Sequence, residues 1–413
     1  MIKLVRPVAG LLASTLLLLT GLGLIGVLLP IRAGLEGWSP VVVGWIGFGY
    51  ALSFTAGCLV VPRLVLRVGH VRVYAVLATI LAMSTLLHAL LIQPIAWIVF
   101  RGIAGFALAG TYMIVESWIN EKTGNEDRGK MYSVYMVTTM VGVMAGQFLL
   151  VTADPATTTL FMVSALLFAA AVIPTGLSNA SSPKPLTEVS FDLAKLYRNS
   201  PLASVGIILT GVTFGAYIFQ APVYLQLSGF SDVQIATAMA AAMVGGMAFQ
   251  FPLGRLSDGM DRRRVIVATT FAGLILSAIL ATSTGISFIA LTALMFLFGG
   301  VLMPLYSIVT AHANDHAAPD EFVKISSGLL ILYGVGSMAG PVIAGAFMNA
   351  MGPTGFFVLM AGSYLAFGLY AAWRITRRAP VPQEEMTGFT YAPPVAQTPE
   401  AIQLNPRADD AAA

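Results

Sequence analysis

Two charged side chains lie inside long apolar stretches of this sequence, Arg101 and Glu116. A charge near the centre of a bilayer costs roughly 2.5–3.5 kcal/mol on insertion scales, so such a residue faces water or a partner. The two stand 15 positions apart, which on one helix is about 22 Å along the axis and about 60° in azimuth. They are too far apart to pair with each other, yet both can line the same wall.

Each of these charges has more than one chemical interpretation. For Arg101 we predict that it binds an anionic or polar group of the substrate, or that it interacts with the site of the coupling proton. The alternative is a structural role, in which it donates hydrogen bonds to backbone carbonyls of a neighbouring broken helix. Glu116 is either an ionic latch to Arg63, Arg67 or Arg72, a proton carrier, or a solvated helix end. The latch is the interpretation that we predict.

A polar stripe in a later apolar stretch supplies further candidates. Tyr217, Gln220 and Tyr224 stand at i, i+3 and i+7, which places them on one helix face, and Pro222 should kink the helix beside them. Two more tyrosines lie in apolar stretches related by an internal repeat, and packing is the alternative for every tyrosine. The predicted substrate-binding residues are Arg101, Tyr112, Tyr217, Gln220, Tyr224 and Tyr306.

The composition requires a membrane around these residues. The chain is 57% apolar and 10% charged, with a mean hydropathy of +0.84, and has too little polar surface to enclose a water-soluble core. Four histidines and one cysteine, Cys58, provide neither a disulfide framework nor a catalytic constellation. His312 and His316 with neighbouring oxygen ligands are too weak a pattern for a metal. We therefore predict no enzyme, no metal, no cofactor and no nucleic-acid partner.

Apolar runs long enough to cross a bilayer, which takes about 20 helical residues, occur twelve times. Their approximate centres are Leu19, Phe54, Ala82, Ala107, Val141, Leu167, Leu209, Ala242, Leu274, Leu297, Gly334 and Gly362. The predicted fold class is all-α integral membrane, with twelve transmembrane helices in two pseudo-symmetric bundles of six. The predicted divisions are an N-terminal bundle over 1–177, a cytoplasmic linker over 178–200 with a short amphipathic helix over 191–198, a C-terminal bundle over 201–375, and a disordered tail over 376–413.

The two halves of the sequence match at an offset of 192 to 194. Gly142-Val-Met-Ala-Gly146 falls on Gly336-Ser-Met-Ala-Gly340, and such small residues permit close helix contact. Packing is the first interpretation of these glycines, and a gating contact is the second. The predicted hinge or packing residues are Gly142, Gly146, Pro222, Gly336, Gly340 and Pro341. Repeated hydrophobic halves are typical of secondary transporters.

Basic residues indicate the orientation. If the N-terminus is inside, all 22 basic residues except Arg32 and Arg101 fall in cytoplasmic segments, as the positive-inside rule requires. We therefore predict a multi-pass protein of the cytoplasmic (inner) membrane with both termini cytoplasmic.

The loop Gly254-Arg-Leu-Ser-Asp258-Gly-Met-Asp-Arg262-Arg-Arg264, with a degraded twin from Arg63 to Arg72, resembles the loop signature of the major facilitator superfamily. Val115-Glu-Ser117 and Pro222-Val-Tyr-Leu225 are similar to its YcaD-like branch. The resemblance implies a central cavity lined by helices 1, 4, 7 and 10, and solute transport. It also implies that Asp258, with Arg262, steadies one conformation.

Two features depart from the superfamily pattern. The first loop lacks the acidic residue that Asp258 supplies in the second, and Gln147 stands where the better-known drug antiporters carry proline. No Gly-x-x-x-x-Gly-Lys-[Ser/Thr] motif is present, which excludes ATP as the direct energy source within this chain. We predict a monomeric, proton-coupled exporter of a small organic or amphipathic solute. The alternatives are a proton-coupled importer of a small anionic metabolite and a lipid flippase.

Overall fold

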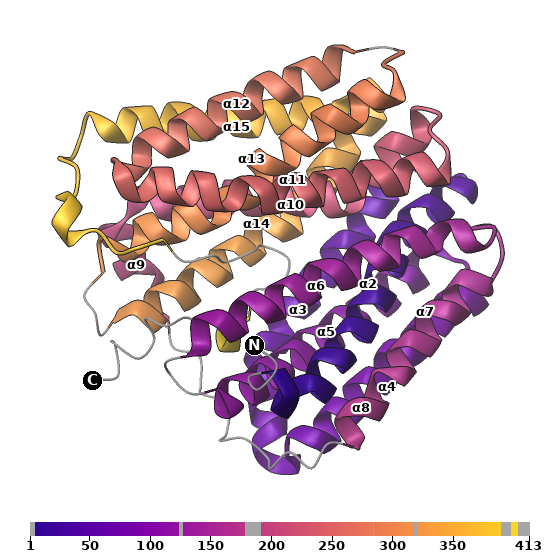
Figure 1. Cartoon of the computed structure of the whole chain (residues 1–413). Coiled ribbons are helices and arrows are strands. Elements are labelled where there is room, and N and C mark those ends of the chain that lie inside the picture. The colour runs from indigo at the N-terminus through magenta and orange to yellow at the C-terminus, as the bar shows by residue number, and fades with distance from the viewer. Residues whose placement is uncertain are drawn as a thin grey trace. The chain divides into compact units, whose positions relative to one another are not determined.

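The computed structural model describes residues 5–123, 127–177, 191–283, 285–317, 321–389 and 398–403, and these residues form helices and connections without any strand (Figure 1). Twelve helical segments are long and apolar enough to span a membrane, which confirms the predicted fold class. The segments of the first half are η1 and α2 (Arg6–Val8 and Ala9–Leu35), α3 (Pro40–Val68), α4 (His70–Leu90), α5 (Pro94–Lys122), α6 with η3 (Arg128–Leu149 and Leu150–Thr152), and α7 with α8 (Thr159–Ala170 and Val172–Gly176).

The second half repeats this series. Its spans are α10 (Pro201–Leu227), α11 (Asp232–Gly259), α12 (Arg262–Thr282), α13 (Phe288–Asn314), α14 (Phe322–Met351) and α15 (Gly355–Ile375). Three short elements lie outside the spans: α9 (Leu193–Asn199), η5 (Gln383–Glu385) and α16 (Pro399–Gln403).

The chain divides into two compact units. The first comprises Met1–Glu36, Ile46–Ser190 and Ala396–Ala413, and the second comprises Gly37–Trp45 and Phe191–Val395. The break near residue 190 falls inside the predicted linker. Two assignments differ from the predicted boundaries: the start of α3 groups with the second unit, and the last helix, α16, groups with the first.

The same helix pairs meet in both units. In the first unit α2 packs on α6 and α7, and α4 packs on α5 and α7; in the second, α10 packs on α14 and α15, and α12 on α13 and α15. The internal repeat seen in the sequence is therefore a repeat of helix packing.

Glycines at the crossings explain why the repeat survives in the sequence. A Cβ on Gly146 would lie 2.1 Å from the carbonyl oxygen of Thr20, and a Cβ on Gly340 would lie 2.1 Å from that of Val212. A Cβ on Gly336 would lie 2.1 Å from the Ile208 oxygen. Only glycine lets these backbones approach so closely. The structure thus places the glycine motifs of α6 and α14 at packing contacts with α2 and α10.

Proline lies inside α10 and α14, and both helices continue past it. Beside Pro222, the Gln220 amide nitrogen donates to the carbonyl oxygens of Pro341, at 3.0 Å, and Pro40, at 2.7 Å. Side-chain donors of this kind satisfy backbone acceptors near helix irregularities in membranes. Both partners of Gln220 lie in the second unit.

The predicted amphipathic helix is present as α9. Asp192 caps it by accepting a hydrogen bond from the Lys195 amide at 2.9 Å, Leu196 is buried, and Tyr197 is exposed. Lys195 also forms an ion pair with Glu321 at the start of α14. The linker residues 178–190 lie outside the described part of the chain.

Within the segment predicted as a disordered tail, the structure describes residues 376–389 and 398–403, which include η5 and α16. The tail lacks the apolar residues of a core, but its polar groups bind carboxylates on the helices. Residues 390–397 and 404–413 lie outside the described part.

Candidate functional site

Arg101 lies in the first half of α5 and is 4% exposed. Its guanidinium carbon stands 4.5 Å from the centroid of the Tyr50 ring on α3, a cation–π contact. The helices approach closely here, since a Cβ on Gly105 would lie 2.4 Å from the Tyr50 carbonyl oxygen. The arginine is therefore held in place by a ring face, an arrangement that preserves its positive charge.

Glu116 lies farther along α5 and is fully buried. The Tyr135 hydroxyl on α6 donates to one carboxyl oxygen at 2.8 Å, and the Thr398 hydroxyl donates to the other. Thr398 immediately precedes α16, which packs on α5. Two hydroxyl groups from different segments thus hold this carboxyl.

The structure does not bring Glu116 together with the predicted latch partners. Arg63, Arg67 and Arg72 are exposed, and no ion pair involves Glu116 among the described residues. The solvated-end interpretation also fails, because the carboxyl is buried. The physical reason is that Tyr135 and Thr398 supply the donors that a cation would have supplied. Of the three interpretations, the proton carrier fits this geometry.

Tyr112 lies one turn before Glu116 on α5 and is also buried. Its ring meets that of Phe54 edge-on, with centroids 6.4 Å apart. Within the described part of the chain its hydroxyl has no hydrogen-bond partner. Buried polar groups usually have such a partner, so this hydroxyl is an exception among the described residues.

The polar stripe of α10 is divided among three neighbouring helices. The Tyr217 hydroxyl approaches the Met239 carbonyl oxygen of α11 at 3.4 Å, Gln220 donates to the backbone of α14, and the Tyr224 ring stands edge-on to Phe357 of α15, 4.8 Å away. All three residues of the stripe are buried. These contacts fit the packing alternative better than a shared substrate surface.

Tyr306 on α13 belongs to an aromatic cluster of the second unit. Its ring is edge-on to Tyr333 at 5.0 Å, and Tyr333 adjoins Phe214, which adjoins Tyr217. The cluster offers ring faces and a few hydroxyl groups, a surface that suits an amphipathic solute.

Charged side chains of the loop between α11 and α12, which carries the superfamily signature, form a network of ion pairs in the second unit. Arg262 is 1% exposed; its Nε lies 2.7 Å from Asp315 and its Nη1 lies 3.0 Å from Asp258. The two carboxylates differ in environment, because the Asp315 side chain is 2% exposed and that of Asp258 is 40% exposed. The predicted partner Asp258 is therefore the outer member, and Asp315 is the buried counterion.

The tail covers this network. The Thr387 amide and hydroxyl donate to Asp315 at 2.8 and 2.6 Å, and its carbonyl accepts from Arg262. The Phe389 amide donates to Asp258 at 2.8 Å. Each member of the network thus has a partner in the tail.

Sequence reasoning missed four of these residues. Asp315 carries a usable signal, since it is an acid at the end of a span on the same membrane side as the basic loop. Tyr135, Thr387 and Thr398 carried no such signal in the sequence.

No group of three or more His, Cys, Asp or Glu side chains among the described residues can hold a metal.

Asp315→Asn is expected to destabilise the protein far more than Asp258→Asn. Leaving Arg262 buried without its counterion costs about 3–5 kcal/mol, whereas losing a half-exposed partner costs about 0–1 kcal/mol. Thermal unfolding of the two purified variants compares them directly. Equal melting temperatures would show that Asp315 is not the partner that stabilises Arg262.

Three comparisons with known proteins complete the description. The model of the Major Facilitator Superfamily matches residues 11–327 and 204–396. The MFS-type transporter YcaD of Escherichia fergusonii is 26% identical over 360 residues, covering 86% of this chain and 92% of that protein. An MFS-type transporter of Yersinia pseudotuberculosis is 27% identical over 361 residues, with 86% and 93% covered.

Two solved structures show the same fold at low identity. The nucleoside transporter NupG has a TM-score of 0.78 at 13% identity and covers 88% of this chain and 98% of its own. A bacterial homologue of the human lysosomal transporter Spinster, in an inward-facing and occupied conformation, has a TM-score of 0.71 at 14% identity, with 92% and 97% covered.

Proposed function

Because the chain belongs to the Major Facilitator Superfamily and is a multi-pass membrane transporter, we propose that it is a proton-coupled secondary transporter. It moves a small organic or amphipathic solute by alternating access and exports that solute. Glu116 carries the coupling proton in this proposal.

The observation that carries the proposal is the environment of Glu116. Its carboxyl is buried on α5. The repeat-related helix of the second unit, α13, carries Thr310 at the equivalent position 194 residues later, so only one of the two related helices has an acid there. It is bound by hydroxyl groups and has no cationic partner among the described residues. Burying a carboxylate charge without a cation is costly. A carboxyl in such a place can hold a proton in one conformation and release it when another conformation hydrates it.

The solute class is supported by the candidate binding residues of each unit. Arg101 and the unpartnered Tyr112 hydroxyl offer a charge and a donor, and the cluster around Tyr306 offers ring surface. Within the first unit alone, the Tyr50 and Phe54 rings lie beside Arg101 and Tyr112. Ring surface next to a charge and a hydroxyl group favours a solute with both an apolar body and a polar group.

For the orientation we propose cytoplasmic termini in the inner membrane, which the distribution of basic residues supports. The single native cysteine, Cys58, is buried. An impermeant thiol reagent on intact cells should therefore label Ser228→Cys and spare Lys122→Cys. The reverse pattern would overturn this orientation.

The function is tested in proteoliposomes loaded with ethidium, uridine or benzoate, which represent an amphipathic cation, a nucleoside and an anion. An imposed pH gradient is expected to drive one of them out of the vesicles against its own gradient, and collapsing the gradient should stop it. Failure of a pH gradient to move any solute that the protein does exchange would overturn the proton coupling.

A second candidate function rests on Arg101, whose buried cation suits a carboxylate or phosphate. This second candidate function is proton-coupled import of a small anionic metabolite. In the same assay it predicts that, of the three solutes, only benzoate would move, and that it would move in the same direction as the protons. The lipid flippase alternative is tested in the same vesicles with a fluorescent phospholipid and an impermeant quencher. A flippase would change the fraction of the labelled phospholipid that the quencher reaches in the outer leaflet.

A further inference from the structure

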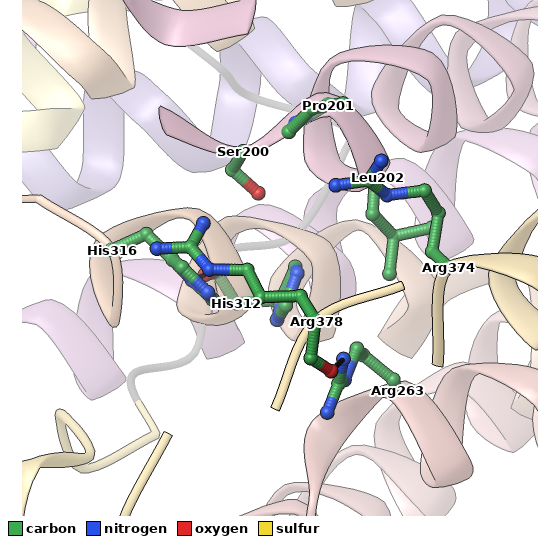
Figure 2. A pocket seen from close by; sticks show the side chains of 8 residues that line it. All are labelled: Ser200, Pro201, Leu202, Arg263, His312, His316, Arg374 and Arg378. Carbon is green, nitrogen blue, oxygen red and sulfur yellow. Dashed lines mark hydrogen bonds between the residues drawn. The ribbon is translucent and has the colours of Figure 1, made fainter. Parts of the chain in front are cut away.

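A cavity opens to solvent at one end of the second unit. It is lined by residues at the ends of four spanning helices and in the segment after α15: Ser200, Pro201, Leu202, Arg263, His312, His316, Arg374 and Arg378. Figure 2 shows three arginine and two histidine side chains around one opening, with the Ser200 hydroxyl directed toward it. Among the residues that the structure describes, no acidic side chain lines the cavity.

The positive charge of this cavity comes from two arginines. Arg263 is neutralised by Asp261, whose carboxylate lies 2.7 Å away; burial acts to raise the pKa of Asp261, but the hydrogen bonds and charge of Arg263 lower it below its ordinary value. Arg374 and Arg378 form no ion pair among the described residues. The Arg378 guanidinium donates to the Asn199 carbonyl oxygen at 2.9 Å. Within the part of the chain that the structure describes, these two cationic groups therefore have no counterion.

The remaining lining is suited to an anion. Pro201 is the first residue of α10 and Ser200 is its cap, so the positive end of a 27-residue helix dipole faces the cavity. His316 lies beyond the end of α13, and burial lowers its pKa. Its Nδ1 lies 3.0 Å from the His312 carbonyl oxygen, which can only accept, so the neutral ring donates its one N–H there. The groups that can bind an anion are therefore the arginines and the helix end.

The surroundings of the cavity are typical of the membrane interface. Trp373, at the end of α15, is 47% exposed, and Leu369 one turn earlier is 63% exposed. The guanidinium groups of Arg374 and Arg377 lie 5.7 and 5.4 Å from the Trp373 ring, and Tyr370 packs against the same ring at 5.7 Å. An exposed tryptophan flanked by tyrosine and arginine marks the depth of lipid headgroups.

We propose that this cavity binds the phosphate of an anionic phospholipid headgroup from the leaflet at that end of the helices. Arg374 and Arg378 provide forked donors for the phosphate oxygens, and the α10 N-terminus adds its dipole. A basic pocket between spanning helices at headgroup depth is a setting in which such lipids bind. The apolar surface around Leu369 accommodates the acyl chains.

The test uses the full-length protein in phosphatidylcholine nanodiscs that contain increasing fractions of phosphatidylglycerol, with bound lipid counted by native mass spectrometry. The wild-type protein should retain phosphatidylglycerol, and the double variant Arg374→Gln, Arg378→Gln should require at least about tenfold more of it. Arg377→Gln is the matched control. It removes one positive charge near the same helix end, beside the same tryptophan, but does not line the cavity, so it is compared with each single variant, Arg374→Gln and Arg378→Gln, as well as with the double variant.

Each outcome decides the proposal. Retention reduced equally by Arg377→Gln would show that a diffuse surface charge attracts the lipid, and would overturn the site. Displacement of phosphatidylglycerol by millimolar inorganic phosphate would show a soluble-anion site instead of a lipid site. Arg378→Lys keeps the positive charge and should retain more phosphatidylglycerol than Arg378→Gln. The unfolding temperatures of the two variants, measured in pure phosphatidylcholine, control for folding and should be equal. Equal lipid retention by these two variants would overturn the role of Arg378.

Discussion

Glu116→Gln is expected to abolish solute movement driven by a pH gradient while solute exchange without a gradient continues. The amide keeps the shape of the side chain. Its oxygen can accept one of the two hydrogen bonds that Tyr135 and Thr398 donate to the carboxyl oxygens, and its nitrogen can donate to the other hydroxyl, but the amide cannot take up a proton. The driven flux should fall to the level of empty liposomes. The melting temperature should change little, within about 1 kcal/mol of stability, because no buried cation loses its partner.

Tyr135→Phe is the control for this result. It removes the hydroxyl that holds the carboxyl at 2.8 Å and leaves the titrating group in place, so driven transport should persist at a reduced rate. Driven transport at the wild-type rate in Glu116→Gln would exclude this residue as the proton carrier. A large loss of stability in Glu116→Gln would instead indicate a cationic partner in another conformation.

Gly299→Val is expected to prevent normal folding. A Cβ at this position of α13 would lie 1.8 Å from the Ala242 carbonyl oxygen of α11, and both partners are helix backbone that cannot move aside locally. Overpacking of this kind costs typically 1–3 kcal/mol, and a clash with backbone belongs at or above the upper end. Size-exclusion profiles and melting temperatures in detergent measure the loss.

Gly362→Val provides the matched control in the same unit. It makes the same change within the spanning helix α15, but a Cβ there meets nothing within 4 Å, so its melting temperature should stay near that of the wild type. If Gly299→Val melted at the same temperature as Gly362→Val, the close contact between α11 and α13 would not exist in the protein.

The spans and their repeat could be predicted because the signals are local. A run of about 20 apolar residues must cross the bilayer as a helix, and the glycines at 146 and 340 recur because the same backbone crossing recurs. Arg101 and Glu116 could also be singled out as candidates, since a charged residue within an apolar stretch can be read directly from the sequence.

The partners of those charges could not be predicted in the same way. Thr398 reaches Glu116 across 282 positions of sequence, and nothing in the composition of the tail indicates which of its hydroxyls does so. Low hydrophobicity predicted disorder there, but a few hydrogen bonds to buried carboxylates suffice to position short segments. The resemblance to the superfamily loop signature pointed to Asp258 as a partner of Arg262, but it did not reveal that Asp315 is the buried partner.

The polar stripe of α10 shows a related limit. Helical geometry correctly places Tyr217, Gln220 and Tyr224 in a spaced series, but it does not distinguish a side chain that faces water from one that faces another helix. In the structure their contacts go to α11, α14 and α15. A periodic pattern identifies which residues share a face and leaves the neighbour of that face undetermined.

The most direct test of proton-coupled export is the lumenal pH of proteoliposomes that contain trapped pyranine, recorded while the transported solute flows out down its own gradient with no pH gradient imposed. Outward flow should draw protons in through wild-type protein and acidify the lumen, at a rate proportional to solute flux, and Glu116→Gln should uncouple the two. Solute efflux at an unchanged lumenal pH would contradict proton coupling, and efflux that makes the lumen alkaline would contradict exchange and favour the importer.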